Sequence, residues 1–165
     1  MTLQEAAARA DEFAQQGNER ELSQLRSQWG DELEAAARSA DYRERAVAFR
    51  AVGQFRWRQK EELLRRGLDD DSPACRGSAL LSLELLSRDH PSTVNQCRSL
   101  LHNLATGDGN QAVRRLAILC LKNGSPQRDT IVLLEGLGEN DELDGELRQA
   151  ATRVAALLRK KAPKR

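Results

Sequence analysis

Residues 108–121 read DGNQAVRRLAILCL, and the Arg-x-x-Ala unit inside this stretch recurs along the chain. Each copy opens a run in which apolar residues recur every three or four positions, the period of one face of a helix. The steps between copies are 33, 38 and 34 residues, a spacing typical of stacked helix pairs. The copies begin at Arg43, Arg76, Arg114 and Arg148.

The remainder of the chain shows the same helical period and no sustained alternation of period two. The strand-like run 130–134 has no second strand to pair with, so we expect a helix there. Ser72-Pro73 and Ser125-Pro126 each place a capping hydroxyl before a proline, and His90-Pro91 also precedes a helical pattern. These patterns predict an all-α chain.

In three of the four copies an acidic residue lies six positions before the repeat arginine, whereas the first copy has Ala37 there. The pairs are Asp70 with Arg76, Asp108 with Arg114, and Glu142 with Arg148. This arrangement resembles the HEAT-repeat family, in which a turn aspartate and a second-helix arginine recur six apart, followed by Ala and Leu at helical spacing.

The resemblance implies a right-handed α-α superhelix, or solenoid, of about four to five antiparallel helix pairs. Residues 42–160 would form the HEAT-like repeats and residues 1–41 a pair of N-terminal capping helices. Residues 161–165 would form a basic tail, with the whole chain as a single folded unit. Stacking is required because one helix pair cannot bury its apolar face alone.

The repeat arginines are expected to hold the stack together. Each guanidinium can reach the acidic turn of its own or the next repeat and form charge-assisted hydrogen bonds. The predicted structural ladder consists of Asp70, Arg76, Asp108, Arg114 and Arg148.

The resemblance also implies a binding surface, because second helices line the concave side in this family. Counting one, five, eight and twelve residues from each repeat arginine gives a column of mostly polar side chains. Leu81 and Leu119 lie in its middle, and an apolar centre with a charged rim is typical of protein interfaces. Alternatively, both leucines turn inward into a broad core face.

The predicted partner-binding residues are Leu81, Glu84, Arg88, Arg115, Leu119, Lys122 and Arg153. In the first copy the same count gives Glu44, Ala48, Ala51 and Phe55.

Catalytic and metal-binding signatures are not found in the sequence. His90 and His102 have no partner at metal-ligand spacing, and Asp69-Asp70-Asp71 lacks the calcium-loop pattern, so we expect no metal and no cofactor. The three cysteines form no Cys-x-x-Cys motif and are expected to be reduced, with Cys97 and Cys120 buried on apolar helix faces. No catalytic residue is predicted, and the chain is not expected to be an enzyme.

Basic and acidic residues are nearly balanced, 26 against 25, which argues against a dedicated nucleic-acid binder. The charges are nevertheless grouped, with a net +5 over residues 42–66 and a net +7 over residues 148–165. Segment 55–60, FRWRQK, could stack on bases, or it could pack its basic stems on a half-buried Trp57, which we favour.

We therefore expect a non-catalytic scaffold or adaptor that binds a protein through its concave face. One alternative is a nucleic-acid-binding HEAT-like protein. Another is a HEAT-like lyase or chaperone-type assembly factor. The chain lacks a membrane-spanning stretch and a signal-peptide pattern, so we expect no membrane partner and a cytoplasmic location.

Overall fold

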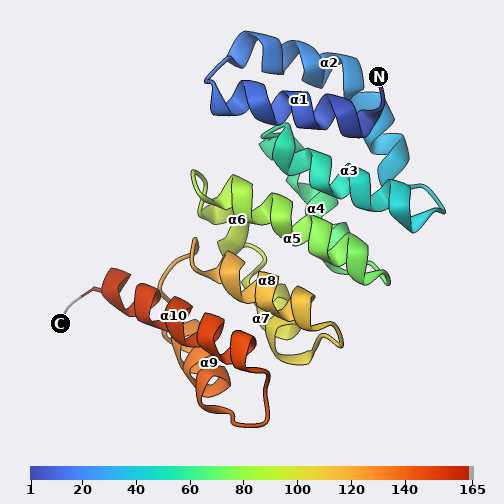
Figure 1. Cartoon of the computed structure of the whole chain (residues 1–165). Helices are drawn as coiled ribbons and strands as arrows, with labels where there is room; N and C mark the ends of the chain where they lie inside the picture. The colour runs from blue at the N-terminus through green and yellow to red at the C-terminus, as the bar shows by residue number, and fades with distance from the viewer. Residues whose placement is uncertain (164–165) are drawn as a thin grey trace. The chain divides into compact units, whose positions relative to one another are not determined.

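The computed structural model of the chain describes residues 1–163, and every regular element in that range is helical (Figure 1). This confirms the all-α prediction, and the strand-like run 130–134 lies inside a helix. The elements are α1 (Leu3–Gln15), α2 (Glu19–Ala37), α3 (Tyr42–Gln54), η1 (Arg58–Lys60), α4 (Glu61–Leu68), α5 (Pro73–Ser87), α6 (Ser92–Asn95), α7 (Arg98–Gly107), α8 (Gln111–Leu121), α9 (Arg128–Glu139) and α10 (Gly145–Lys161).

The chain divides into two compact units, Met1–Leu86 (unit 1) and Ser87–Arg165 (unit 2). The boundaries expected at residues 41 and 160 do not coincide with this division. α10 continues through Lys161, the first residue of the expected basic tail. Residues 164–165 of that tail lie outside the described residues. The superhelical arrangement of the repeats stays a prediction.

Short polar residues fix where many of the helices begin. Each of these caps accepts a hydrogen bond from a backbone N–H of the first turn, which has no acceptor inside the helix. The capping residues are Thr2, Asn18, Asp41, Asn110 and Asp144. α5 begins at Pro73, directly after Ser72, as the first Ser-Pro pair predicted.

The second Ser-Pro pair, Ser125-Pro126, does not begin a helix where the sequence predicted one, because α9 starts at Arg128. Ser125 is held by Asn95 instead. Its N–H donates to Asn95 Oδ1 at 2.8 Å, and Asn95 Nδ2 donates to Ser125 Oγ at 2.9 Å. With both groups engaged by Asn95, Ser125 belongs to the turn and does not cap the helix.

The core of unit 1 forms where α1, α2 and α3 pack against one another. α1 contributes Ala6, Ala7 and Ala10, which are fully buried and let their neighbours approach closely. Phe55 is the largest fully buried side chain, and leucines supply most of the remaining volume. The fully buried leucines of this unit are Leu22, Leu33, Leu64, Leu68, Leu80 and Leu83.

α3 and α5 meet at Gly53, where the backbones lie too close for any side chain. A Cβ added to Gly53 would lie 2.5 Å from the Cα of Ser82. The fully buried Ser82 hydroxyl accepts a hydrogen bond from the Gly53 N–H at 2.9 Å and donates to the carbonyl of Phe49. Both polar groups of this contact are therefore satisfied inside the protein.

In unit 2, α7 packs on α8, α9 packs on α10, and α8 packs on α10. The fully buried aliphatic side chains of this unit include Leu101, Ile118, Leu121, Leu134, Leu147 and Leu158. α9 and α10 approach closely at Gly138, where an added Cβ would lie 2.3 Å from the Thr152 hydroxyl. Two helix pairs thus share one aliphatic core in this unit.

Replacing Gly53 with Ala should destabilise unit 1, although Ala favours helix more than Gly does. The added methyl overlaps the Ser82 backbone, and overpacking of this kind costs roughly 1–3 kcal/mol. The matched control is Gly136→Ala in α9, where an added Cβ meets nothing within 4 Å. That change should raise stability by about 0.5–1 kcal/mol. Urea denaturation measures both, and equal effects at the two positions would contradict the close contact.

Candidate protein-binding face

Three of the four repeat arginines donate to backbone carbonyls at the end of the preceding helix or in the turn after it. Arg76 Nη1 lies 2.9 Å from the carbonyl of Asp70, and Arg114 Nε lies 2.9 Å from that of Ala105. Arg148 Nε lies 3.4 Å from the carbonyl of Gly138. The last carbonyls of a helix lack intrahelical donors and carry partial negative charge, so a guanidinium satisfies and stabilises them.

In the first repeat this role belongs to Arg45 and not to Arg43, from which the sequence repeat was counted. Arg45 Nη1 donates to the carbonyls of Ser39 at 3.1 Å and Ala40 at 3.2 Å. Arg43 is exposed and lies beside Asp41, with Nε 3.3 Å from Oδ1. We name Arg45, Arg76, Arg114 and Arg148 the anchor arginines.

The anchor arginines share one position relative to the start of their helices. The N–H of each donates to the carbonyl of the residue four positions earlier, which directly precedes the helix. These bonds join Arg45 to Asp41, Arg76 to Ser72, Arg114 to Asn110, and Arg148 to Asp144. A polar residue followed by an arginine four positions later is therefore the regular unit of the fold.

Asp70 connects two repeats within unit 1. Its carboxylate accepts two hydrogen bonds from Arg45, at 2.9 and 3.1 Å, and one from the Ser72 N–H at 2.9 Å. Burial alone would raise the pKa of Asp70, but the hydrogen bonds from Arg45 and Ser72 hold it below its ordinary value. The same pair raises the pKa of Arg45. Asp70 is thus bound to the anchor arginine of the previous repeat.

When the count starts at Arg45 instead of Arg43, the residues that it assigns to the predicted face in the first repeat move two positions toward the C-terminus. The count from Arg43 assigned Ala48, Ala51 and Phe55 to that face, but all three side chains are buried. The corrected count gives Ala46, Arg50, Gly53 and Trp57, of which Gly53 is buried and the other three are half-buried. Arg50 therefore occupies the position in α3 that Leu81 occupies in α5, five residues after the anchor.

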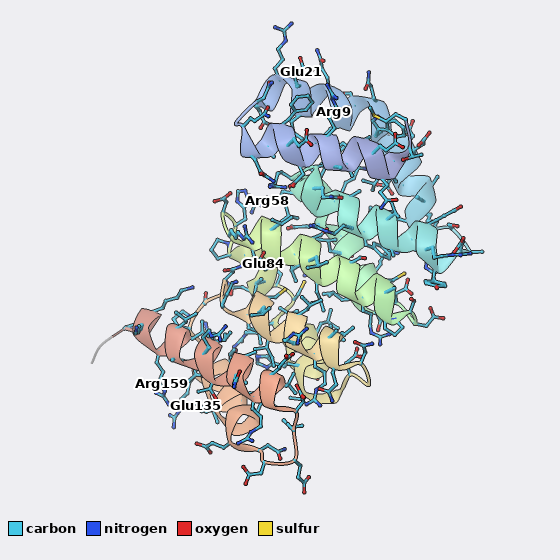
Figure 2. All side chains as sticks on the ribbon, viewed as in Figure 1. Arg9, Glu21, Arg58, Glu84, Glu135 and Arg159 are labelled. Carbon is cyan, nitrogen blue, oxygen red and sulfur yellow. The ribbon has the colours of Figure 1, made fainter. Side chains whose placement is uncertain are left out.

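The α5 column of unit 1 is accessible to solvent. The Leu81 side chain is 40 % exposed, although it is aliphatic. Glu84, which lies one turn further along α5 (Figure 2), is half-buried. Ser78 lies one turn before Leu81 and lines a pocket of about 360 Å³ between α1, α3 and α5. The other lining residues are Gln4, Ala46, Val47, Arg50 and Gln54. We name this cavity the Arg50 pocket.

Unit 2 contains the other predicted partner-binding residues, which lie on α8, on α10 and in the connections that follow α5 and α8. Arg88 and Arg153 are exposed, and Leu119 and Lys122 are half-buried. Arg115 forms an ion pair with Glu146. Leu119 is thus less accessible than Leu81.

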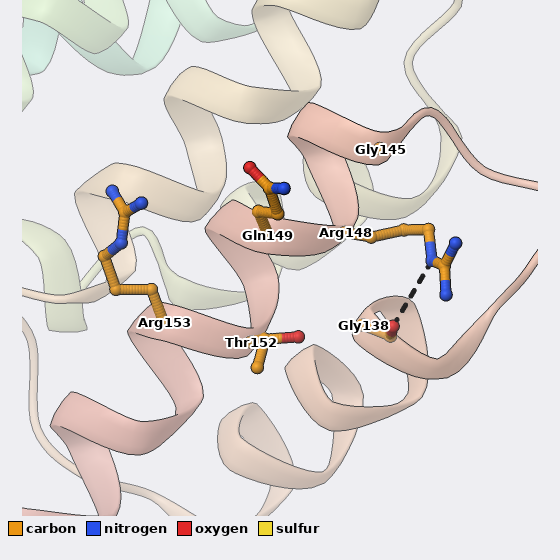
Figure 3. Close-up of a pocket in the computed structure, with 6 residues that line it drawn as sticks. All are labelled: Gly138, Gly145, Arg148, Gln149, Thr152 and Arg153. Atoms are coloured by element: carbon orange, nitrogen blue, oxygen red, sulfur yellow. Dashed lines mark hydrogen bonds between the residues drawn. The ribbon is translucent and has the colours of Figure 1, made fainter.

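A second pocket, of about 530 Å³, lies beside α10 in unit 2 (Figure 3). Arg148 crosses toward Gly138 at one end, whereas Gln149 and Arg153 extend away from that contact (Figure 3). Arg148 also lies 3.1 Å from Asp141, so Arg153 is the cation of this pocket that remains exposed.

The basic segment around Trp57 has a packing role. Arg56 Nη1 lies 2.7 Å from Asp11, and Lys60 Nζ lies 2.7 Å from Glu34 and 4.6 Å from the centre of the Trp57 ring. Trp57 is half-buried and rests against Phe55. Two of the cations that could hold phosphates are therefore neutralised by carboxylates.

Several C-terminal cations are engaged in the same way. Arg159 and Glu135 form two parallel hydrogen bonds of 2.7 Å between α10 and α9 (Figure 2). Lys161 Nζ donates to the carbonyl of Lys122 at 2.6 Å. Within the described part of the basic block 148–165, Arg148, Arg159 and Lys161 thus each have an acceptor.

The three thiols are buried, and the imidazole of His102 is half-buried. Cys75, Cys97 and Cys120 are all buried, as the sequence predicted for the last two, and burial raises the pKa of the Cys75 thiol. His102 Nε2 lies 2.8 Å from the Thr130 hydroxyl, and burial lowers the pKa of this imidazole. Within residues 1–163, no three His, Cys, Asp or Glu side chains gather in a geometry suited to a metal ion.

Comparisons of the chain with protein-family models, with curated proteins and with solved structures find no match. None of the described helices combines the length and the apolar character needed to cross a bilayer. The case for a function therefore depends on the geometry of this chain alone.

Replacing the anchor Arg114 with Met should lower stability by about 1–3 kcal/mol, because the Ala105 carbonyl would lose its donor inside the protein. Arg114 is only 9 % exposed, so water cannot readily replace the guanidinium. Arg128→Met is the control, since Arg128 is exposed at the start of α9 and should change stability by less than about 0.5 kcal/mol. Chemical denaturation compares the two, and an unchanged midpoint for Arg114→Met would refute the anchoring role.

His102 should make unit 2 less stable in mild acid. Burial lowers its pKa from 6.5, so the unfolded chain takes up the proton at a higher pH than the folded one. Stability is then constant well above pH 6.5 and falls as the pH drops below that value. In denaturation curves between pH 5.5 and 7.5, this slope should shrink in His102→Gln and persist in His90→Gln. A slope unchanged in His102→Gln would assign it to other groups.

Proposed function

We propose that the protein is a non-catalytic, HEAT-like scaffold or adaptor that binds a protein partner through the face of its second helices. The observation that carries the proposal is the exposure of Leu81, a large aliphatic side chain that is 40 % accessible on α5. Exposed apolar groups bordered by polar ones are typical of protein interfaces. In unit 1, Leu81 lies between the half-buried Ser78 and Glu84 on the same helix face.

The anchor arginines support this assignment because they occupy structural positions, whereas residues further along the same helices are accessible to solvent. Their guanidinium groups bind backbone carbonyls, and the residues five positions later are partly or largely exposed in each second helix. These four residues are two arginines and two leucines, so they offer a partner both charged and apolar contacts. They are Arg50, Leu81, Leu119 and Arg153.

The nucleic-acid alternative has weaker support. A phosphate-binding surface needs several free cations, since each phosphate contact adds to the electrostatic part of the affinity. Arg56, Lys60 and Arg159, which lie in the two basic blocks, are paired with carboxylates. Their charges are already neutralised within the protein.

The lyase or chaperone alternative would require an accessible nucleophile. The thiolate is the reactive form of cysteine, and burial in apolar surroundings disfavours it. Cys75 is fully buried, and its Sγ donates to the carbonyl of Tyr42 at 3.2 Å. A raised pKa and a covered sulfur do not favour covalent chemistry at this position.

A photo-crosslinking amino acid at position 81 should capture a discrete protein partner in extracts of the native host. The matched position is Val132, which is 54 % exposed on α9, outside the second-helix face. We expect a crosslinked species from position 81 and none of the same mass from position 132. The opposite pattern would move the interface to the first helices.

Leu81→Glu should leave the fold intact and abolish that crosslinked complex, because a charge replaces the exposed apolar contact. Val132→Glu makes the same chemical change elsewhere and should retain the partner. Circular dichroism checks folding in both variants. If Leu81→Glu unfolds, or stays folded and binds the partner normally, the proposed interface is lost.

A further inference from the structure

The Arg50 pocket contains a positive charge without an evident structural purpose. Nη1 of Arg50 is shielded from solvent and has no hydrogen-bond partner among the described residues. A buried donor left unsatisfied is unfavourable, and more so when it carries charge. The anchor arginines show what a structural arginine looks like in this protein, because each of them has defined acceptors.

Nearby carboxylates do not supply the missing acceptor. Asp11 acts on the charge of Arg50 at longer range, but its Oδ1 is bound to Arg56 at 2.7 Å. Glu84 also acts on that charge from α5. Burial lowers the pKa of the Arg50 guanidinium, yet arginine remains protonated at neutral pH. The pocket therefore holds a permanent, partly desolvated cation.

The remaining walls of the pocket suit a small anion carried on a chain. Gln4, Gln54 and Ser78, whose side chains carry neutral donors, line the same pocket as Arg50, and so do the apolar Ala46 and Val47. A guanidinium with neutral donors matches a carboxylate, which arginine can bind in a bidentate geometry. Arg50 is the one charged residue among those that line the pocket, so its walls offer one cation, which matches a singly charged carboxylate better than a doubly charged phosphate.

We propose that the Arg50 pocket binds the side-chain carboxylate of an acidic partner segment, while Leu81 contacts an apolar side chain of the same segment. Arg50 and Ser78 line one cavity, and Leu81 lies one helical turn beyond Ser78 on α5, so one short peptide can reach both. This inference rests on the proposed protein-binding function and specifies the chemistry that the partner presents.

The direct test follows the side-chain Nε–Hε resonance of Arg50 by NMR in the full-length protein. The probe is the acetylated and amidated peptide Gly-Glu-Gly-Leu-Gly, compared with Gly-Gln-Gly-Leu-Gly. We expect a saturable shift with the first peptide and about tenfold weaker binding of the second, since a charge-assisted hydrogen bond is lost. Equal affinity for the two peptides, or no saturable shift, overturns the proposal.

Acetate and inorganic phosphate distinguish a carboxylate-binding pocket from a phosphate-binding one. Sodium acetate should shift the Arg50 resonance in the same direction as the acidic peptide, with lower affinity. Inorganic phosphate should bind more weakly than acetate, because the pocket walls hold a single cation for its double charge. Tighter binding of phosphate than of acetate would overturn the assignment to a carboxylate.

Variants of the arginines on α3 distinguish a binding role from a structural one. Arg50→Gln should abolish the peptide-induced shifts of the Gln4 and Ser78 amides, whereas Arg43→Gln on the same helix should retain them. Arg50→Gln should also melt at the same or a higher temperature, because an unsatisfied buried charge is removed. A clear fall in melting temperature, or peptide binding that survives the change, would refute a binding role.

The two proposals can fail separately. If position 81 crosslinks a partner but neither the acidic peptide nor acetate binds near Arg50, only the pocket assignment fails. If the peptide binds but no partner crosslinks, the pocket stands and the adaptor function does not. Leu81→Glu should weaken binding of the peptide and leave binding of acetate unchanged, since acetate does not contact Leu81.

Discussion

The hydrogen bonds from one guanidinium to the backbone at the end of the preceding helix determine how each helix pair is built. A helix that ends beside its partner leaves carbonyl groups without donors, and the short connection brings the next helix close to them. Because the anchor arginine lies four residues after the residue preceding its helix, it fixes the rotation of that helix as well as its position. The positions that face the core and those that remain accessible follow from that rotation.

The proposed binding face draws on the same geometry. Many charged side chains of this protein form ion pairs with a neighbouring side chain, as in the Arg45–Asp70 and Arg159–Glu135 pairs. Two features that these contacts do not explain are the exposed Leu81 and the unsatisfied Nη1 of Arg50. Both lie on second helices of unit 1, at equivalent positions relative to their anchors. Side chains whose exposure or missing partner is not explained by the packing are therefore the candidates for a role in binding.

The helices could be predicted from periodicity and from capping residues, because both signals are local. The first anchor could not, because Arg43 and Arg45 each begin an Arg-x-x-Ala unit and motif spacing cannot choose between them. The signal that decides is Ser39, six residues before Arg45. Its hydroxyl accepts from the Asp41 N–H at 3.1 Å, as the Asp70 carboxylate accepts from Ser72. A pattern that requires an acidic residue does not detect a serine in this role. It therefore starts the count at Arg43 and does not assign Arg50 to the predicted face.

The contact between Gly53 and Ser82 has a consequence for the way the chain is made. The Ser82 hydroxyl supplies the last turn of α3 with an acceptor for its Gly53 N–H and a donor for its Phe49 carbonyl, from 29 residues further along. A chain emerging from the ribosome can form the first turns of α3 alone, but its final turn lacks these bonds until α5 has been synthesised. α3 and α5 are thereby coupled in time as well as in space, with the end of one helix completed by the arrival of the other.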